Sequence, residues 1–107
     1  MNFNEYQKKS RRTAKYPEKN FIYPTLGLAG EAGEVAEKVK KVIRDKEGKL
    51  DSETITDIGL ELGDVLWYLS QLATELGLSL DDIAERNISK LYSRLQRGKI
   101  HGNGDKR

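Results

Sequence analysis

The chain has 107 residues, the size of one domain with at most a modest core. It contains no cysteine and one histidine, His101, which excludes disulfides, zinc–thiolate sites and a histidine relay. No apolar run approaches the roughly 20 residues of a membrane span. Residues 1–12 also lack the apolar stretch of a signal peptide, so we expect a cytoplasmic protein without membrane contact.

The net charge of +2 conceals an uneven distribution of charge along the chain. Residues 1–20 carry six basic and two acidic residues, and residues 86–107 carry seven basic residues and one acidic residue. Residues 21–85 carry fourteen acidic and six basic residues. An acidic middle therefore lies between two basic ends, and this asymmetry requires an explanation.

The first half of the chain predicts two helices separated by an irregular segment. We expect the first helix over about residues 4–14, with Asn4 as its N-cap. Two prolines place irregular structure at residues 15–24. The second helix is expected over about 24–45, because its apolar residues recur at helical spacing. This stripe consists of Leu28, Ala32, Val35, Val39, Val42 and Ile43.

The second half predicts two further helices with clear start and stop signals. The third helix is expected to begin near Ser52, which supplies a cap, and to end at Leu76, before Gly77. Ser79 is expected to cap the fourth helix, which ends before Gly98. The apolar stripe of this helix consists of Leu80, Ala84, Ile88, Leu91 and Leu95.

Four helices joined by short links predict an all-α fold, specifically a four-helix bundle. We expect one helical domain over residues 1–97. Residues 98–107 are polar and glycine-rich, which predicts a flexible tail.

Four carboxylates lie along the edge of the apolar stripes of the second and third helices. Glu31 and Glu34 are spaced i, i+3, and so are Glu61 and Asp64. Each acid alone fits an ordinary solvated side chain. Two such pairs brought together would repel by about 3 kcal/mol per pair at roughly 5 Å, so a cluster would need protonation or bound cations. Oxygen ligands without sulfur or imidazole select Mg²⁺ or Mn²⁺.

Glycines are frequent in and beside these two helices, although each costs about 1 kcal/mol relative to alanine inside a helix. Close helix approach or room for a ligand would explain them, and so would simple tolerance. They are Gly27, Gly30, Gly33, Gly59 and Gly63.

The fourth helix places Asn87, Lys90 and Arg94 on one arc beside its apolar stripe. An amide, an ammonium and a guanidinium suit phosphate oxygens. A solvated basic face is the simpler interpretation of this arc alone. Nucleic-acid binding would use the same charge, but the acidic middle and the lack of a recognisable reading motif argue against it.

Two segments carry a resemblance to a known family. GLAGEAGEVAEKVKK (27–41) and ELGDVLWYLSQLATELGLS (61–79) resemble the MazG-type nucleotide pyrophosphohydrolases of the all-α NTP pyrophosphatase superfamily. ERNISKLYSRLQRGK (85–99) resembles the family's last helix. The family's E-x-x-E and E-x-x-D motifs fall on Glu31, Glu34, Glu61 and Asp64, and its N-x-x-K-x-x-x-R pattern falls on Asn87, Lys90 and Arg94.

The resemblance implies that a nucleoside triphosphate is hydrolysed to the monophosphate and pyrophosphate in a Mg²⁺-dependent reaction, with house-cleaning of nucleotide pools as its role. The four acids would bind the metal, for which Mn²⁺ can substitute, and one acid would help to activate the attacking water. The basic arc would hold phosphate and sugar oxygens. The resemblance also implies a homodimer or homotetramer.

Four aromatic residues are candidates for stacking on a base: Phe21, Tyr23, Trp67 and Tyr68. Tyr68 lies beside the acids on its helix, and we expect it to contact the substrate, since aromatic faces stack on bases. Trp67 lies off the apolar stripe and fits packing in the core or at a subunit interface. Lys38 lies beside the first acid pair, and we expect a salt bridge there.

A second class of function stays open. A catalytically silent helical module could bind protein or nucleic acid through its basic ends. A di-iron bundle would use similar carboxylates, but it needs Glu-x-x-His motifs, and the single histidine, His101, argues against it. Pyrophosphate release from nucleotides would separate the enzyme from the silent module.

Overall fold

The computed structural model describes all 107 residues and contains four helices and no strand, which confirms the all-α class. No helix combines the length and apolarity needed to cross a bilayer. The helices are α1 (Phe3–Arg11), α2 (Ile22–Lys46), α3 (Ser52–Glu75) and α4 (Leu80–Gln96).

The cap of α1 differs from the prediction. Asn2, not Asn4, caps the helix, because its Oδ1 accepts a hydrogen bond from the backbone N–H of Glu5 at 2.8 Å. Asn4 Oδ1 instead accepts from the Ser79 hydroxyl at 2.7 Å. Both asparagines are competent caps, but α1 begins at Phe3, so Asn4 lies inside the helix and its side chain contacts the α4 cap residue instead.

The ends of α3 and α4 follow ordinary capping chemistry. Asp51 rather than Ser52 caps α3, with Oδ1 accepting from the backbone N–H of Thr54 at 2.7 Å. Gly77 follows α3 with a φ of 71°, a left-handed conformation that favours glycine. Ser79 caps α4 as predicted.

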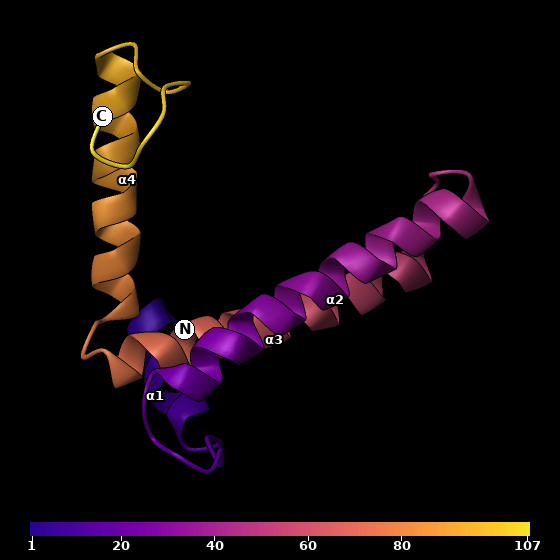
Figure 1. The fold of residues 1–107 in the computed structure, drawn as a ribbon, viewed down its shortest axis with the longest axis horizontal. Coiled ribbons are helices and arrows are strands. Elements are labelled where there is room, and N and C mark those ends of the chain that lie inside the picture. The colour runs from indigo at the N-terminus through magenta and orange to yellow at the C-terminus, as the bar shows by residue number, and fades with distance from the viewer.

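Helices α2 and α3 form a long antiparallel pair (Figure 1). Close approach is required near one end, since a β-carbon at Gly27 would collide with the ring of Tyr68. The other α2 and α3 glycines have open space around them. Of the two interpretations of these glycines, close approach therefore applies to Gly27.

Helix α1 lies against α3 through a buried polar network. The Ser10 and Ser70 hydroxyls are 3.0 Å apart, and Gln71 Nε2 donates to Ser10 Oγ at 3.0 Å. Ser70 and Gln71 are fully buried. This junction is therefore specified by hydrogen bonds between buried polar groups.

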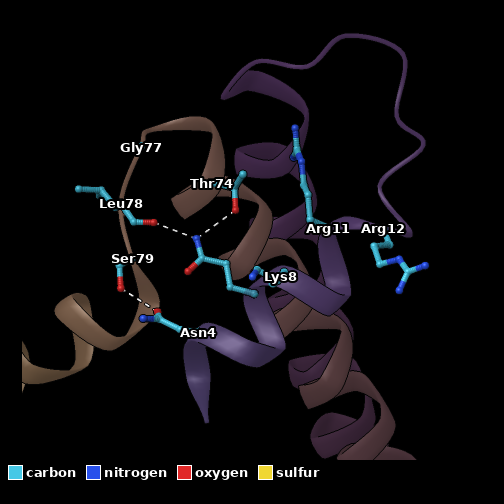
Figure 2. A pocket seen from close by; sticks show the side chains of 9 residues that line it. Asn4, Lys8, Arg11, Arg12, Thr74, Gly77, Leu78 and Ser79 are labelled. Carbon is cyan, nitrogen blue, oxygen red and sulfur yellow. Dashed lines mark hydrogen bonds between the residues drawn. The ribbon is translucent and has the colours of Figure 1, made fainter. Parts of the chain in front are cut away.

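A groove of about 570 Å³ lies where α1 meets the α3–α4 turn (Figure 2). Beside it, Gln7 Nε2 donates to Thr74 Oγ1 at 3.0 Å and to the Leu78 carbonyl at 2.8 Å. Gln7 Oε1 accepts from the backbone N–H of Leu80 at 2.9 Å. These bonds hold the turn and fix the direction in which α4 leaves α3.

Helix α4 projects away from the α2–α3 pair and packs on α1 at its beginning (Figure 1). Its predicted apolar stripe is therefore largely uncovered, with Ile88 49% and Leu95 62% exposed. Val39 and Leu62 are also exposed on the α2–α3 pair. The predicted stripes are present, but one chain covers only part of them and does not close the bundle.

Residues 98–107 turn back along α4 (Figure 1). The flexibility of this tail and the domain boundary at residue 97 stay predictions.

Candidate functional site

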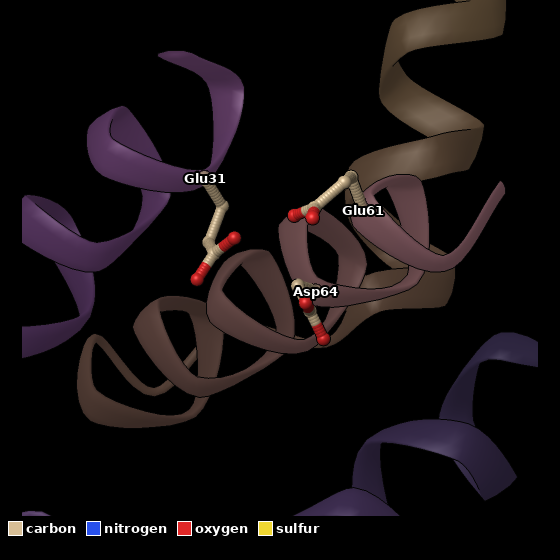
Figure 3. A group of neighbouring side chains, drawn as sticks. All are labelled: Glu31, Glu61 and Asp64. Atoms are coloured by element: carbon tan, nitrogen blue, oxygen red, sulfur yellow. The ribbon is translucent and has the colours of Figure 1, made fainter. Parts of the chain in front are cut away.

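Three of the four predicted acids meet across the α2–α3 pair. Glu31 from α2 and Glu61 and Asp64 from α3 each offer a carboxylate oxygen, and these oxygens lie within 4.8 Å of one another (Figure 3). The i, i+3 spacing places Glu61 and Asp64 on the same face of α3. The antiparallel neighbour α2 presents Glu31 to that face. We call Glu31, Glu61 and Asp64 the carboxylate cluster.

Negative charge is incompletely balanced in the carboxylate cluster. The pKa of Glu31 lies above its ordinary value because of partial burial and then the negative charges of Asp64, Glu61 and Glu34. Lys38 Nζ pairs with Glu61 Oε1 of α3 at 3.8 Å, so Lys38 makes a salt bridge, but not with the expected acids of its own helix. Several oxygen donors with excess negative charge fit a hard divalent cation such as Mg²⁺.

Glu34 lies on α2 one turn beyond Glu31, outside the carboxylate cluster, and is exposed. Its charge nevertheless contributes to the raised pKa of Glu31. The structure thus brings three of the four motif acids together and leaves Glu34 at the solvent edge. The role of Glu34 stays a prediction.

Tyr68 lies beside the carboxylate cluster, as its helical position predicts. Burial raises the pKa of its hydroxyl, and Tyr23 and the charges of Glu31 and Asp64 raise it further. Its ring meets Trp67 edge-on with centroids 5.0 Å apart. Tyr68 therefore stays protonated near neutral pH and is held by neighbouring aromatic rings close to the acids.

An aromatic and ionic cluster next to Tyr68 escaped the sequence reasoning. Tyr16 stacks on Tyr23 with ring centroids 5.3 Å apart, and Trp67 Nε1 donates to Thr13 Oγ1 at 2.8 Å. Trp67 thus packs within the chain. These residues come from α2, α3 and the link before α2, so no periodic signal could have joined them.

The ionic part of this cluster centres on Glu75 of α3. Glu75 accepts a hydrogen bond from the Tyr16 hydroxyl and pairs with Arg11 at 2.8 Å. Both contacts lower the pKa of Glu75, with the Tyr16 hydrogen bond as the larger cause. Arg11 also lines the groove of Figure 2, and none of the residues lining that groove is acidic.

The predicted basic arc forms on α4 but does not reach the acids of its own chain. Asn87 is exposed, Lys90 is half-buried and Arg94 is 5% exposed. Because α4 is directed away from the α2–α3 pair, one chain keeps the two charged groups apart (Figure 1).

Lys90 and Arg94 instead converge on Asp105 of the C-terminal segment. The sequence reasoning missed Asp105. A signal was available, since Asp105 is the one acidic residue among residues 86–107.

Comparison with known proteins connects this geometry to a family. Gene 37 protein of Mycobacterium phage L5 is 46% identical over 114 aligned residues, which cover all of both chains. No solved structure matches the chain. Residues 23–98 match the MazG nucleotide pyrophosphohydrolase domain, and this segment contains the carboxylate cluster and the basic arc. The chain therefore belongs to the MazG nucleotide pyrophosphohydrolase family.

Proposed function

We propose that this protein hydrolyses nucleoside or deoxynucleoside triphosphates to the monophosphate and pyrophosphate in a Mg²⁺-dependent reaction. Mn²⁺ would substitute, and house-cleaning of nucleotide pools is the proposed role. The observation that carries the proposal is the carboxylate cluster, whose oxygens lie within 4.8 Å of one another in a chain of this family.

The proposed metal ligands are Glu31, Glu61 and Asp64, with Glu34 at the solvent edge of the same site. A triphosphate carries about four negative charges, so carboxylates alone would repel it. Bound Mg²⁺ would supply charge neutralisation and a lower pKa for the attacking water. One carboxylate of the set would accept the proton of that water as its oxygen attacks the α-phosphorus. The bond that breaks is the α–β phosphoanhydride bond, and pyrophosphate leaves.

The remaining site residues would bind rather than react. Lys90 and Arg94 would offset charge on the phosphate oxygens, and Asn87 would donate to phosphate or sugar oxygens. Tyr68, held beside the acids by its aromatic neighbours, would contact the nucleotide. Because every base has a π-face, this contact would tolerate several bases.

Pyrophosphate release from a panel of ribo- and deoxynucleoside triphosphates tests the reaction. We expect release with Mg²⁺ or Mn²⁺ and none in EDTA. Glu61→Gln should reduce kcat at least about a hundredfold, because it removes a metal-binding charge while keeping the side-chain size. Glu37→Gln is the matched control, since Glu37 lies on α2 and pairs with Lys40 outside the carboxylate cluster.

Two results would reject the proposed metal-dependent enzyme. Release that is unaffected by EDTA and by Glu61→Gln would remove the metal role of the acids. No release from any nucleotide would favour the alternative, a non-catalytic helical module that binds protein or nucleic acid through its basic ends.

A homodimer is the proposed minimum assembly, with a homotetramer as its extension. Two features of the single chain support it. The stripe of α4 leaves Ile88 and Leu95 about half exposed or more, at 49% and 62%, and large uncovered apolar faces mark association surfaces. The acids and the basic arc are also apart within one chain, so α4 of a partner copy would complete the site. Light scattering that gives a 12.1 kDa particle would contradict the dimer.

A further inference from the structure

The C-terminal segment, residues 98–107, returns along α4 in an internally bonded conformation (Figure 1). Gly98 begins the return with a φ of 68°, a conformation suited to glycine. The Arg107 guanidinium then donates to the carbonyls of Lys99 and Ile100, each at 2.8 Å, and to that of Gly104. These bonds close the segment into a loop that presents Asp105 to the C-terminal half of α4.

Asp105 contacts both cations of the basic arc. Its Oδ1 accepts from Lys90 Nζ at 2.7 Å and from an Arg94 nitrogen at 3.1 Å, and its carbonyl accepts from the same Arg94 nitrogen. Hydrogen bonds from Lys90 and then Arg94 lower the pKa of Asp105. An anionic oxygen thus bridges an ammonium and a guanidinium, as a phosphate oxygen would.

Arg94 carries a second, independent sign of a ligand. The residue is 5% exposed, and its Nε is buried without any hydrogen-bond partner. A buried donor without a partner is unfavourable. One carboxylate oxygen serves both Lys90 and Arg94 here, so Asp105 leaves this donor unused. A phosphate group offers three oxygens, enough for Lys90 Nζ, the terminal Arg94 nitrogen and Arg94 Nε.

The two side chains of the Arg94–Asp105 contact differ in solvent exposure. The Asp105 side chain is 79% exposed, whereas that of Arg94 is 6% exposed. Exposed ion pairs are weak and are screened by salt. The pair of Asp105 with Lys90, whose side chain is 36% exposed, is of this kind, so the Asp105 carboxylate is free to leave the contact.

We propose that Asp105 is an intramolecular competitor for the phosphate site, and that the C-terminal segment occupies Lys90 and Arg94 until a phosphate anion displaces it. This inference rests on the proposed phosphate-binding role of these two residues. The tethered carboxylate acts at an effective concentration on the order of millimolar, so it raises the substrate concentration needed for binding. It leaves the chemical step at the carboxylate cluster unchanged.

Asp105→Asn in the full chain removes the competing charge and keeps the side-chain size. Binding of inorganic pyrophosphate in metal-free buffer is followed by NMR through the Arg94 Nε–H signal. If the segment occupies the site about nine-tenths of the time, Asp105→Asn should bind pyrophosphate about tenfold more tightly. Glu85→Gln is the matched control, because it removes the same charge from an exposed position of α4 that makes no ion pair in the structure.

Steady-state kinetics gives the second readout. Asp105→Asn should lower KM for the nucleotide by a similar factor while kcat stays unchanged, and Glu85→Gln should change neither. Equal pyrophosphate affinity in Asp105→Asn and the wild-type chain would overturn the proposal that Asp105 competes with phosphate, whether or not the protein hydrolyses nucleotides. Tighter pyrophosphate binding without hydrolysis of any nucleotide rejects the proposed enzyme and leaves the competition for the anion standing.

Discussion

The junction of α1 with α3 is buried within the chain, whereas the part of α4 beyond its first turns is largely exposed. At the junction Gln71 and Ser70 are fully buried and hydrogen-bonded within the chain. Along α4, Ile88 and Leu95 are 49% and 62% exposed. The acids lie on the helix pair attached to the first region, and the phosphate-binding candidates lie on α4. One chain therefore positions its acids by its own packing, whereas it leaves much of the apolar face of α4 uncovered.

The largest expected effect comes from a charge on the apolar face of α4. Ile88→Asp should raise the dissociation constant of the dimer at least about a hundredfold, because association would bury an unpaired carboxylate. Pyrophosphate release should fall with the dimer. Analytical ultracentrifugation over a concentration series measures the dissociation constant.

Ser89→Asp is the control for this variant, since Ser89 is exposed and lies off the apolar stripe, about 100° around α4 from Ile88. It adds the same charge and should leave the assembly intact. A stable dimer in Ile88→Asp would show that the α4 face is not an interface.

The polar junction should be the most sensitive part of the fold within one chain. Gln71→Ala should lower the free energy of unfolding by about 2–4 kcal/mol, since it leaves a cavity and removes one of the hydrogen-bond partners of Ser10 Oγ. Urea unfolding measures the change. Gln96→Ala makes the same substitution at an exposed end of α4 and should stay within about 0.5 kcal/mol. Equal losses of unfolding free energy in Gln71→Ala and Gln96→Ala would contradict the contrast between the α1–α3 junction and α4.

Alanine substitutions at two glycines of α2 compare a position packed against the chain with a position that faces open space. Gly27→Ala should cost about 1–3 kcal/mol of unfolding free energy, because the ring of Tyr68 must move. Gly30→Ala meets open space and should raise stability by up to about 1 kcal/mol through helix propensity. Thermal unfolding at matched concentrations compares them. A destabilised Gly30→Ala would mean that a partner copy covers this position, and an unchanged Gly27→Ala would contradict the close approach.

The smallest expected effect is the acid sensitivity that Glu75 gives to the polar junction. Its pKa lies below the ordinary 4.5, because Tyr16 and then Arg11 favour the charged form. A depressed carboxyl pKa stabilises the fold above the ordinary value, and this stability is lost as the pH falls below it. Glu75→Gln should therefore show a shallower loss of unfolding free energy below about pH 5 than the wild-type chain. Urea unfolding at several pH values measures the slope, and Glu85→Gln should keep the wild-type slope.

Helical periodicity and motif spacing predicted the four helices, the acids and the arc, because these depend on residues near one another in sequence. Capping was less predictable, since Asn4 serves the α3–α4 turn instead of its own helix. The stripe containing Ile88 was identified, but periodicity gives the apolar face of a helix and not what covers it. The contact of Asp105 with Lys90 depends on the returning C-terminal segment, which no local pattern encodes.

Complementation between two inactive variants tests the shared site most directly. Glu61→Gln subunits lack an acid and Lys90→Ala/Arg94→Ala subunits lack the cations, so each alone should be inactive. When they are unfolded and refolded together, half of the dimers are mixed and each mixed dimer has one intact site. A site shared between two copies should restore about a quarter of wild-type pyrophosphate release. No recovery, with mixed dimers present by native mass spectrometry, would contradict a site built from the acids of one copy and the α4 cations of the other.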